Sequence, residues 1–216
     1  MKAYIDSAVL KAYSDLVGRP DFALQANGAR LLAEITSGMH DRRTTAPKRS
    51  LPEDALSDDL RIGHCWTFEG SKAQLGVKLS ELVYPSHFSI DHIPASIATD
   101  IRSAPRAIVL WGAVDGPVNE QRLLVTPPNT TLLASIGRSS PGLTYGFVYV
   151  PLAVVEYDIY AATHVQTFPL DSYVAQSGVD FGIMVFEILS NWGGETTSLY
   201  RVRLHGEPIR SHAHVS

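Results

Sequence analysis

From about residue 65 onward, short runs rich in Val, Ile, Leu, Phe and Tyr alternate with breaks made of Gly, Pro, Asn and Ser. Runs of this kind are typical of β-strands. They cover residues 75–84, 88–93, 107–114, 145–160, 165–170, 181–189 and 199–205. Because no helical pattern separates them, the sequence predicts a mainly β protein, an antiparallel, jelly-roll-like β-sandwich with a short N-terminal helix.

The last run has strict period two. Tyr200, Val202 and Leu204 alternate with Arg201, Arg203 and His205. Side chains of successive strand residues point to opposite faces, so this strand is predicted to carry one buried row and one polar row.

Three segments fall outside this pattern. Residues 3–17 carry apolar side chains at helical spacing, which predicts an amphipathic helix within 1–19 that packs on its own domain or joins a helical bundle between subunits. Residues 37–59 are polar and charged, and we interpret 37–56 as an exposed loop or as a lid that contacts a partner; its basic residues are Arg42, Arg43, Lys48 and Arg49. Residues 115–160 form an extended excursion whose first part, 115–143, is rich in Pro and Gly and predicts one or two strands, and 209–216 form a tail.

Composition and net charge argue against some classes of function. The chain has 216 residues, 45% of them hydrophobic, and a formal net charge of −4. This acidic balance argues against a nucleic-acid binder, since such domains are usually basic. No run of about 18 apolar residues exists, so a membrane anchor, if the protein has one, is expected outside this fragment.

Candidate catalytic residues do not form a known arrangement. Cys65 is the single cysteine, and its neighbour His64 is predicted to point to the opposite face of a strand, so a Cys–His pair is not expected. The histidines and the cysteine lack zinc-site spacing, and no phosphate-binding loop occurs. The sequence therefore predicts a protein without catalytic activity. Asn129 begins an N-T-T sequon, which matters only if the domain faces a secretory lumen.

Several stretches together resemble the SUN-domain family. Residues 63–70 read GHCWTFEG, 90–94 read IDHIP and 103–106 read SAPR. The closing stretches are FEILSNWG at 186–193 and YRVRLHGEP at 200–208, and PDFAL at 20–24 is similar to the segment after the family's last helix. The resemblance runs from about residue 3 to 208 with the order of motifs intact, which places a SUN domain at 20–208.

The resemblance implies a function. SUN domains lie in the perinuclear space on proteins anchored in the inner nuclear membrane. They bind the C-terminal tails of KASH proteins of the outer membrane, as homotrimers assembled with upstream coiled coils, and so link the nucleus to the cytoskeleton in the LINC complex. By the same resemblance, His92, Ser103 and Tyr200 line a pocket for the carboxylate of the KASH tail. The segment from about 54 to 64 corresponds to a loop that holds a monovalent cation, K⁺ or Na⁺, with candidate residues Asp54, Ser57, Asp58, Asp59 and His64.

The sequence also departs from the family pattern. Cys65 matches one half of a disulfide whose other position is Ser198. Thr36 stands where some relatives carry a cysteine that bonds to the KASH tail, so binding here is expected to be noncovalent. A second pocket tyrosine is replaced near Thr196, and the lid is too polar for an amphipathic hairpin. Two rival hypotheses stay open: a carbohydrate-binding jelly-roll module, which predicts exposed aromatic side chains on a sheet face or in a groove, and a cysteine-dependent enzyme, which predicts an exposed Cys65.

Overall fold

The computed structural model describes residues 19–38 and 50–209. The predicted N-terminal helix, the tail from 210 and the four basic residues Arg42, Arg43, Lys48 and Arg49 lie outside these residues. The described elements are, in chain order, η1 (Gln25–Asn27), β1 (Arg30–Leu31), η2 (Ala33–Ile35), η3 (Pro52–Leu56), β2 (Trp66–Glu69), β3 (Ala73–Asp91), η4 (Ile101–Ser103), β4 (Ala107–Val114), α2 (Pro117–Val125), α3 (Thr130–Ile136), β5 (Val148–Glu156), β6 (Val165–Pro169), α4 (Ser172–Ser177), β7 (Phe181–Ile188), β8 (Thr196–Leu199) and β9 (Arg201–Pro208).

The long strand β3 organises an antiparallel β-sandwich, as predicted. Its first half pairs with β1 and β7, and β7 continues through β4 to β5, whereas its second half pairs with β6 and β9. The pairing register shifts between Lys78 and Val83 and again between Pro85 and His87. These irregularities bend β3, so the two runs predicted as separate strands are one strand. Its first half belongs to the first layer, with β1, β7, β4 and β5, and its second half belongs to the second layer, with β6 and β9.

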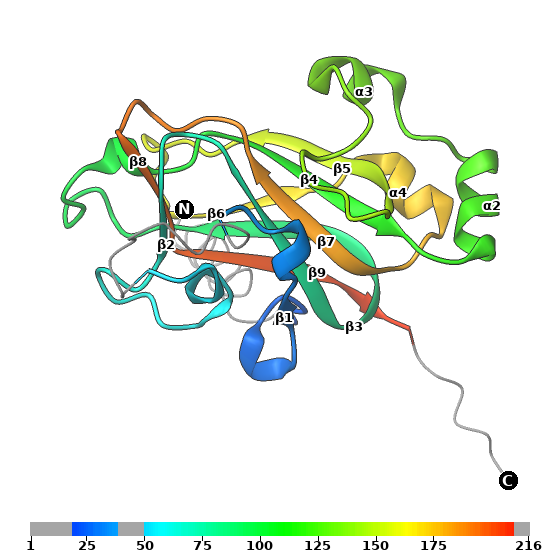
Figure 1. Cartoon of the computed structure of the whole chain (residues 1–216), viewed down its shortest axis with the longest axis horizontal. Helices are drawn as coiled ribbons and strands as arrows, with labels where there is room; N and C mark the ends of the chain where they lie inside the picture. The colour runs from blue at the N-terminus through cyan, green and yellow to red at the C-terminus, as the bar shows by residue number, and fades with distance from the viewer. Residues whose placement is uncertain (1–18, 39–49, 210–216) are drawn as a thin grey trace, which may run out of the picture.

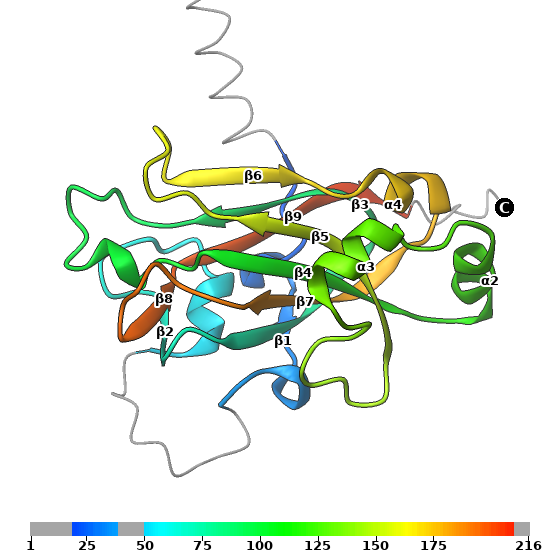
Figure 2. The same cartoon turned by 90° about the horizontal axis from the view of Figure 1, so that it is seen from above.

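The prediction of one or two strands in residues 115–143 is wrong. Residues 115–143 contain the short helices α2 and α3 and no strand, and α4 is a third helix that the sequence reading missed. Gly116 and Pro117 start α2, with the proline at a position whose backbone N–H needs no helical partner. Figure 2 shows α2, α3 and α4 at one end of the molecule and the two-stranded β2–β8 pair at the other.

Apolar residues fill both faces of the first layer. The main core lies between the layers and includes Phe88, Phe186 and Leu204. A smaller cluster, with Trp111 and Val185, lies on the opposite face of β4 and β7. The segment around Ile35 packs there against Gly76, where an added Cβ would lie only 2.2 Å from the Ile35 side chain.

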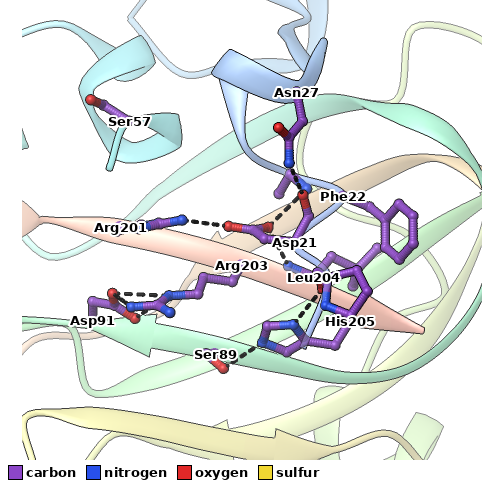
Figure 3. A network of polar contacts seen from close by, with 12 residues as sticks. Asp21, Phe22, Asn27, Ser57, Ser89, Asp91, Arg201, Arg203, Leu204 and His205 are labelled. Atoms are coloured by element: carbon purple, nitrogen blue, oxygen red, sulfur yellow. Dashed lines mark hydrogen bonds and ion pairs between the residues drawn. The ribbon is translucent and has the colours of Figure 1, made fainter. Parts of the chain in front are cut away.

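The polar row of β9 is buried as well as the apolar row. Arg201 pairs with Asp21 at 2.8 Å, and Arg203 binds both carboxylate oxygens of Asp91, which is fully buried. His205 lies between the Pro20 carbonyl, 2.8 Å from Nδ1, and the Ser89 hydroxyl, 2.9 Å from Nε2. Figure 3 shows these contacts on one side of β9. The network ties the segment at residues 20–24 to both β9 and β3 (Figure 1).

Removing one member of the Asp91–Arg203 pair should make the protein easier to unfold. We expect Arg203→Met to lower the free energy of unfolding by about 3–5 kcal/mol, because it leaves the Asp91 carboxylate buried without its main counter-charge. The double variant Asp91→Leu/Arg203→Met should recover a large part of that loss. Urea unfolding measures both, with Arg61→Met as the exposed control, for which a loss below about 1 kcal/mol is expected. A single variant as stable as the wild type would show that the pair does not stabilise the fold.

Two buried histidines should make stability depend on pH. Burial lowers the pKa of His92 and of His205 below the ordinary value of 6.5. The unfolded chain therefore takes up protons that the folded chain does not, and stability that is present above about pH 6.5 is lost as the pH falls. Urea unfolding at a series of pH values should show this decline, and His205→Gln, which can keep both hydrogen bonds, should make it shallower by up to about 1.4 kcal/mol per pH unit. An unchanged slope in the variant would contradict a titrating role for His205.

Candidate functional site

A cavity of about 580 Å³ opens at the β2–β8 end of the sandwich. Its walls come from η4, from the loop that follows β7 and from β8; the lining residues are Thr99, Asp100, Arg102, Ser103, Gly193, Gly194, Glu195, Thr196 and Ser198. Ser103 was predicted to line a carboxylate pocket, and a second pocket tyrosine was predicted to be replaced near Thr196. The fold thus brings both of these positions to one cavity.

Local hydrogen bonds fix the η4 wall. The Asp100 carboxylate accepts from the Arg102 backbone N–H at 3.0 Å and from its guanidinium at 2.9 and 3.0 Å. These bonds lower the pKa of Asp100. The Ser103 hydroxyl donates to the Asp100 carbonyl at 2.8 Å, so in this arrangement its oxygen is free to accept a hydrogen bond.

Residues 193–196 form the opposite wall, and Asn191 and Trp192 hold it in place. The Asn191 amide donates to the carbonyls of Gly194 and Thr196 at 2.9 and 3.1 Å, and the backbone N–H of Trp192 donates to the Arg102 carbonyl at 3.0 Å. At Gly194 an added Cβ would lie 3.0 Å from the Ser103 nitrogen. Glycine therefore allows the two walls to approach this closely.

His92 and Tyr200 contact each other but do not line the cavity. Their ring centroids are 4.8 Å apart in an edge-on arrangement, and the two residues are only 2% and 5% exposed. Burial raises the pKa of Tyr200 to about 12, so its phenol stays protonated. Of the three predicted pocket residues, the structure therefore joins His92 to Tyr200 beneath the surface and leaves Ser103 at the cavity.

The protonation state of His92 decides whether its Nε2 accepts or donates a hydrogen bond. Nδ1 lies 3.1 Å from the Ile93 carbonyl, which can only accept, so Nδ1 carries the proton of the neutral ring. Nε2 is buried and has no hydrogen-bond partner within the described part of the chain. In the neutral ring Nε2 is an acceptor, and it becomes a donor to a carboxylate only when His92 is protonated.

Cys65 is a buried thiol, 4% exposed, packed with Ile93 and Tyr200. Its sulfur lies 3.5 Å from the Thr67 hydroxyl, which in turn lies 3.2 Å from the Ser198 hydroxyl. His64 is half-exposed and contacts Asp59 at 3.3 Å. The structure therefore gives no support to the cysteine-enzyme hypothesis, which requires an exposed thiol.

The predicted cation-loop residues make local contacts. Asp54 accepts from the Leu51 N–H at 2.9 Å, and Ser57 accepts from the Asp59 N–H at 3.1 Å. Asp59 is bound by Arg61, which lowers its pKa to about 2, and Asp58 is exposed. In residues 19–38 and 50–209, no cluster of three or more His, Cys, Asp or Glu side chains is arranged to hold a metal ion. A monovalent cation held by backbone carbonyls stays a prediction.

Asn129 caps α3. Its side-chain oxygen accepts from the Thr131 N–H at 2.9 Å, and its amide donates to Asp171 at 3.2 Å. The residue is exposed, so glycosylation at this sequon also stays a prediction.

Sequence reasoning missed part of this cavity. Asp100 and Arg102 line it beside Ser103, and Gly193 and Gly194 allow its walls to meet. The Asp-x-Arg spacing at a helix start and the paired glycines were the available signals. This cavity has no aromatic lining residue, so it gives no support to the carbohydrate hypothesis, but exposed aromatic side chains occur elsewhere, Tyr145 and Tyr160 among them, and that hypothesis stays open.

The Sad1/UNC-like C-terminal family model matches residues 42–129 and 145–208. The chain belongs to this SUN-domain family. It is 29% identical to SUN domain-containing protein 1 of Homo sapiens over 97% of this chain and 24% of that protein, and 32% identical to Klaroid protein of Drosophila melanogaster over 50% of this chain and 12% of that protein. The chain thus spans about a quarter or less of the length of these two relatives.

Solved structures support the fold assignment. A family 32 carbohydrate-binding module from Streptococcus pneumoniae EndoD superimposes with a TM-score of 0.54 at 10% identity, covering 87% of this chain and all of that one. At this identity the likeness shows a shared β-sandwich and nothing about ligands. In the described part of the SUN domain, no helix is long and apolar enough to cross a membrane.

Proposed function

We propose that this SUN domain is a noncatalytic module that binds the C-terminal tail of a KASH protein in the perinuclear space. The observation that carries the proposal is the cavity at the β2–β8 end, whose lining includes Ser103, Arg102 and Thr196. The Ser103 hydroxyl can donate to a free carboxylate once it turns away from the Asp100 carbonyl. The Arg102 guanidinium holds Asp100 through Nε and Nη2 and offers the N–H groups of Nη1. Family membership supports the same partner.

The full protein would bridge the inner and outer nuclear membranes. Its anchor and coiled coils would precede this domain, and a homotrimer would present three tail sites. Tethering several tails to one trimer raises the overall strength of attachment without any new contact.

The His92 and Tyr200 side chains must become accessible if they bind the tail directly. Their burial in the single chain leaves two routes: the tail carboxylate contacts Ser103 and the cavity rim alone, or tail binding opens the wall toward His92 and Tyr200. The variants below distinguish these routes.

A synthetic KASH tail with a free C-terminus should bind more tightly than the same tail with an amidated C-terminus. We expect about a tenfold difference or more in Kd, because charge-assisted hydrogen bonds to the carboxylate are lost on amidation. Isothermal titration calorimetry measures both peptides. Equal affinities would eliminate the carboxylate pocket.

Ser103→Ala should reduce the difference between acid and amide tails on either route, whereas Tyr200→Phe and His92→Ala should reduce it only if the wall opens. Arg61→Met, an exposed change outside the cavity, is the matched control and should preserve the difference.

Direct binding through His92 should strengthen as the pH falls. Nε2 donates to a carboxylate only in the protonated ring, whose pKa burial holds below 6.5 in the free protein. We expect the acid tail, but not the amide tail, to gain affinity below about pH 6.5, and His92→Gln to remove this gain. A pH-independent affinity for the acid tail would restrict carboxylate binding to the cavity around Ser103.

A further inference from the structure

A second cavity, of about 690 Å³, lies on the other side of the β7–β8 connection. It is formed where the start of β3 and the end of β7 meet the segment that follows α3, and Ser37 and Gly38, the first residues of the predicted lid, also line it. Its apolar walls include Ile136, Leu143, Ile188 and Leu189. Figure 2 shows α3 next to β5, against which it packs.

One wall of this cavity is peculiar to this chain relative to the family model. The model matches up to residue 129 and resumes at 145, so residues 130–144 lie outside it. Ile136, Arg138, Gly142 and Leu143 all belong to this unmatched segment. No residue lines both cavities, so the second cavity is separate from the one around Ser103.

Buried hydrogen bonds hold the unmatched segment on the sheet. Gln74, 3% exposed, donates from its amide nitrogen to the carbonyls of Ile35 and Leu143 at 2.9 and 3.0 Å. The Leu143 N–H donates back to the Gln74 side-chain oxygen at 2.8 Å. The cavity wall is thus preorganised, which lowers the entropy cost of binding.

The Glu187 carboxylate lies at the base of the cavity and is only half satisfied. The residue is 7% exposed, and its Oε2 accepts from the Trp111 indole N–H at 2.8 Å and from Arg138 at 2.6 Å. Oε1 accepts no hydrogen bond from residues 19–38 or 50–209, and it is not sealed from solvent. A Cβ placed on Gly142 would lie 3.9 Å from Oε1, so Oε1 faces the space beside Gly142.

These groups specify the chemistry of an occupant. Apolar walls favour an apolar body, and the Glu187 oxygen that is open to solvent can accept a hydrogen bond from a donor at the tip of that body. The charged lining residues are Lys72, Arg138 and Glu187, with a net formal charge of +1. This positive charge disfavours a cationic donor. Aromatic rings with a neutral O–H or N–H combine the two requirements, and their faces attract nearby cations.

We propose that this cavity binds a tyrosine or tryptophan side chain presented by a protein partner. The phenol O–H or indole N–H donates to Glu187 Oε1, as the Trp111 indole already does to Oε2. The ring packs against Ile136, Leu143 and Leu189. Tyrosine and tryptophan are the residues most often found as anchors at protein interfaces.

Two amino-acid amides that differ by one hydroxyl test the proposal. N-acetyl-tyrosinamide should shift the backbone amide signals of Leu143 and Glu187 in an NMR titration to about 10 mM, and N-acetyl-phenylalaninamide should bind about tenfold more weakly because it lacks the donor. Equal binding of the two amides, or no shift at these residues, would overturn the proposal. So would competition by n-butylamine or by a neutral sugar, which would assign the cavity to another class of ligand.

Gly142→Val provides a steric test, because an added Cβ would lie 3.9 Å from Glu187 Oε1. It would also lie 3.2 Å from the Gln74 side-chain oxygen, so the backbone amide signal of Leu143 in the free variant must first show that the wall is intact. Gly142→Val should abolish the shifts caused by N-acetyl-tyrosinamide. Ser139→Val, an exposed change in the same segment, is the matched control and should leave them unchanged. Undiminished binding by a folded Gly142→Val protein would contradict the proposed position. The acid-versus-amide comparison on the wild-type protein tests the tail site alone, so the two proposals fail separately.

Discussion

The pairing of two arginines of β9 with two acids from distant segments is the constraint on which the rest of the structure depends. Arg201 and Arg203 are largely buried and need counter-charges, because isolated charges in a protein interior are costly. Asp21 supplies one from the entry segment, and Asp91 supplies the other from the end of β3. β9 is therefore fixed between these two segments, and Tyr200, which precedes it, is fixed against His92 at the end of β3.

This constraint also connects the entry segment to the candidate tail site. Asp21 accepts from the Leu204 N–H and from Arg201, and the Pro20 carbonyl contacts His205. Displacing residues 20–24 would expose the Arg201 charge one residue from Tyr200. The position of the entry segment and the geometry around Tyr200 are thus coupled through β9, with hydrogen bonds at each step.

Both cavities occur where regular pairing stops. The first forms where the chain leaves β7, turns at Gly193 with a φ of 101° and enters β8, and the second forms where the unmatched segment covers the end of β7. In each, a buried polar side chain holds irregular backbone in place: Asn191 in the first and Gln74 in the second. A rigid sandwich with side-chain-anchored loops is a common way to position binding groups.

The sequence by itself determined the β-sandwich, because hydrophobic runs and their breaks depend on local residue type. Strand β4 was predicted with its observed bounds, and the family motifs marked β9 and the N-W-G segment. It did not predict helices in 115–143, where Pro and Gly indicated only that the chain turns. It also did not show that the two runs of β3 are one bent strand, since register shifts depend on partners far away in the sequence.

Tertiary structure alone decided the surroundings of the site residues. The period-two pattern along β9 shows to which face each side chain points but not what covers that face. The sequence therefore did not show that Arg201, Arg203 and His205 are largely buried. The same holds for His92, whose buried Nε2 has no hydrogen-bond partner among the described residues, and for Glu187, one of whose oxygens is bound by both Trp111 and Arg138. Burial and hydrogen bonding are set by residues distant in sequence, which is why the family resemblance named His92, Ser103 and Tyr200 as candidates and only the fold assigned their chemistry.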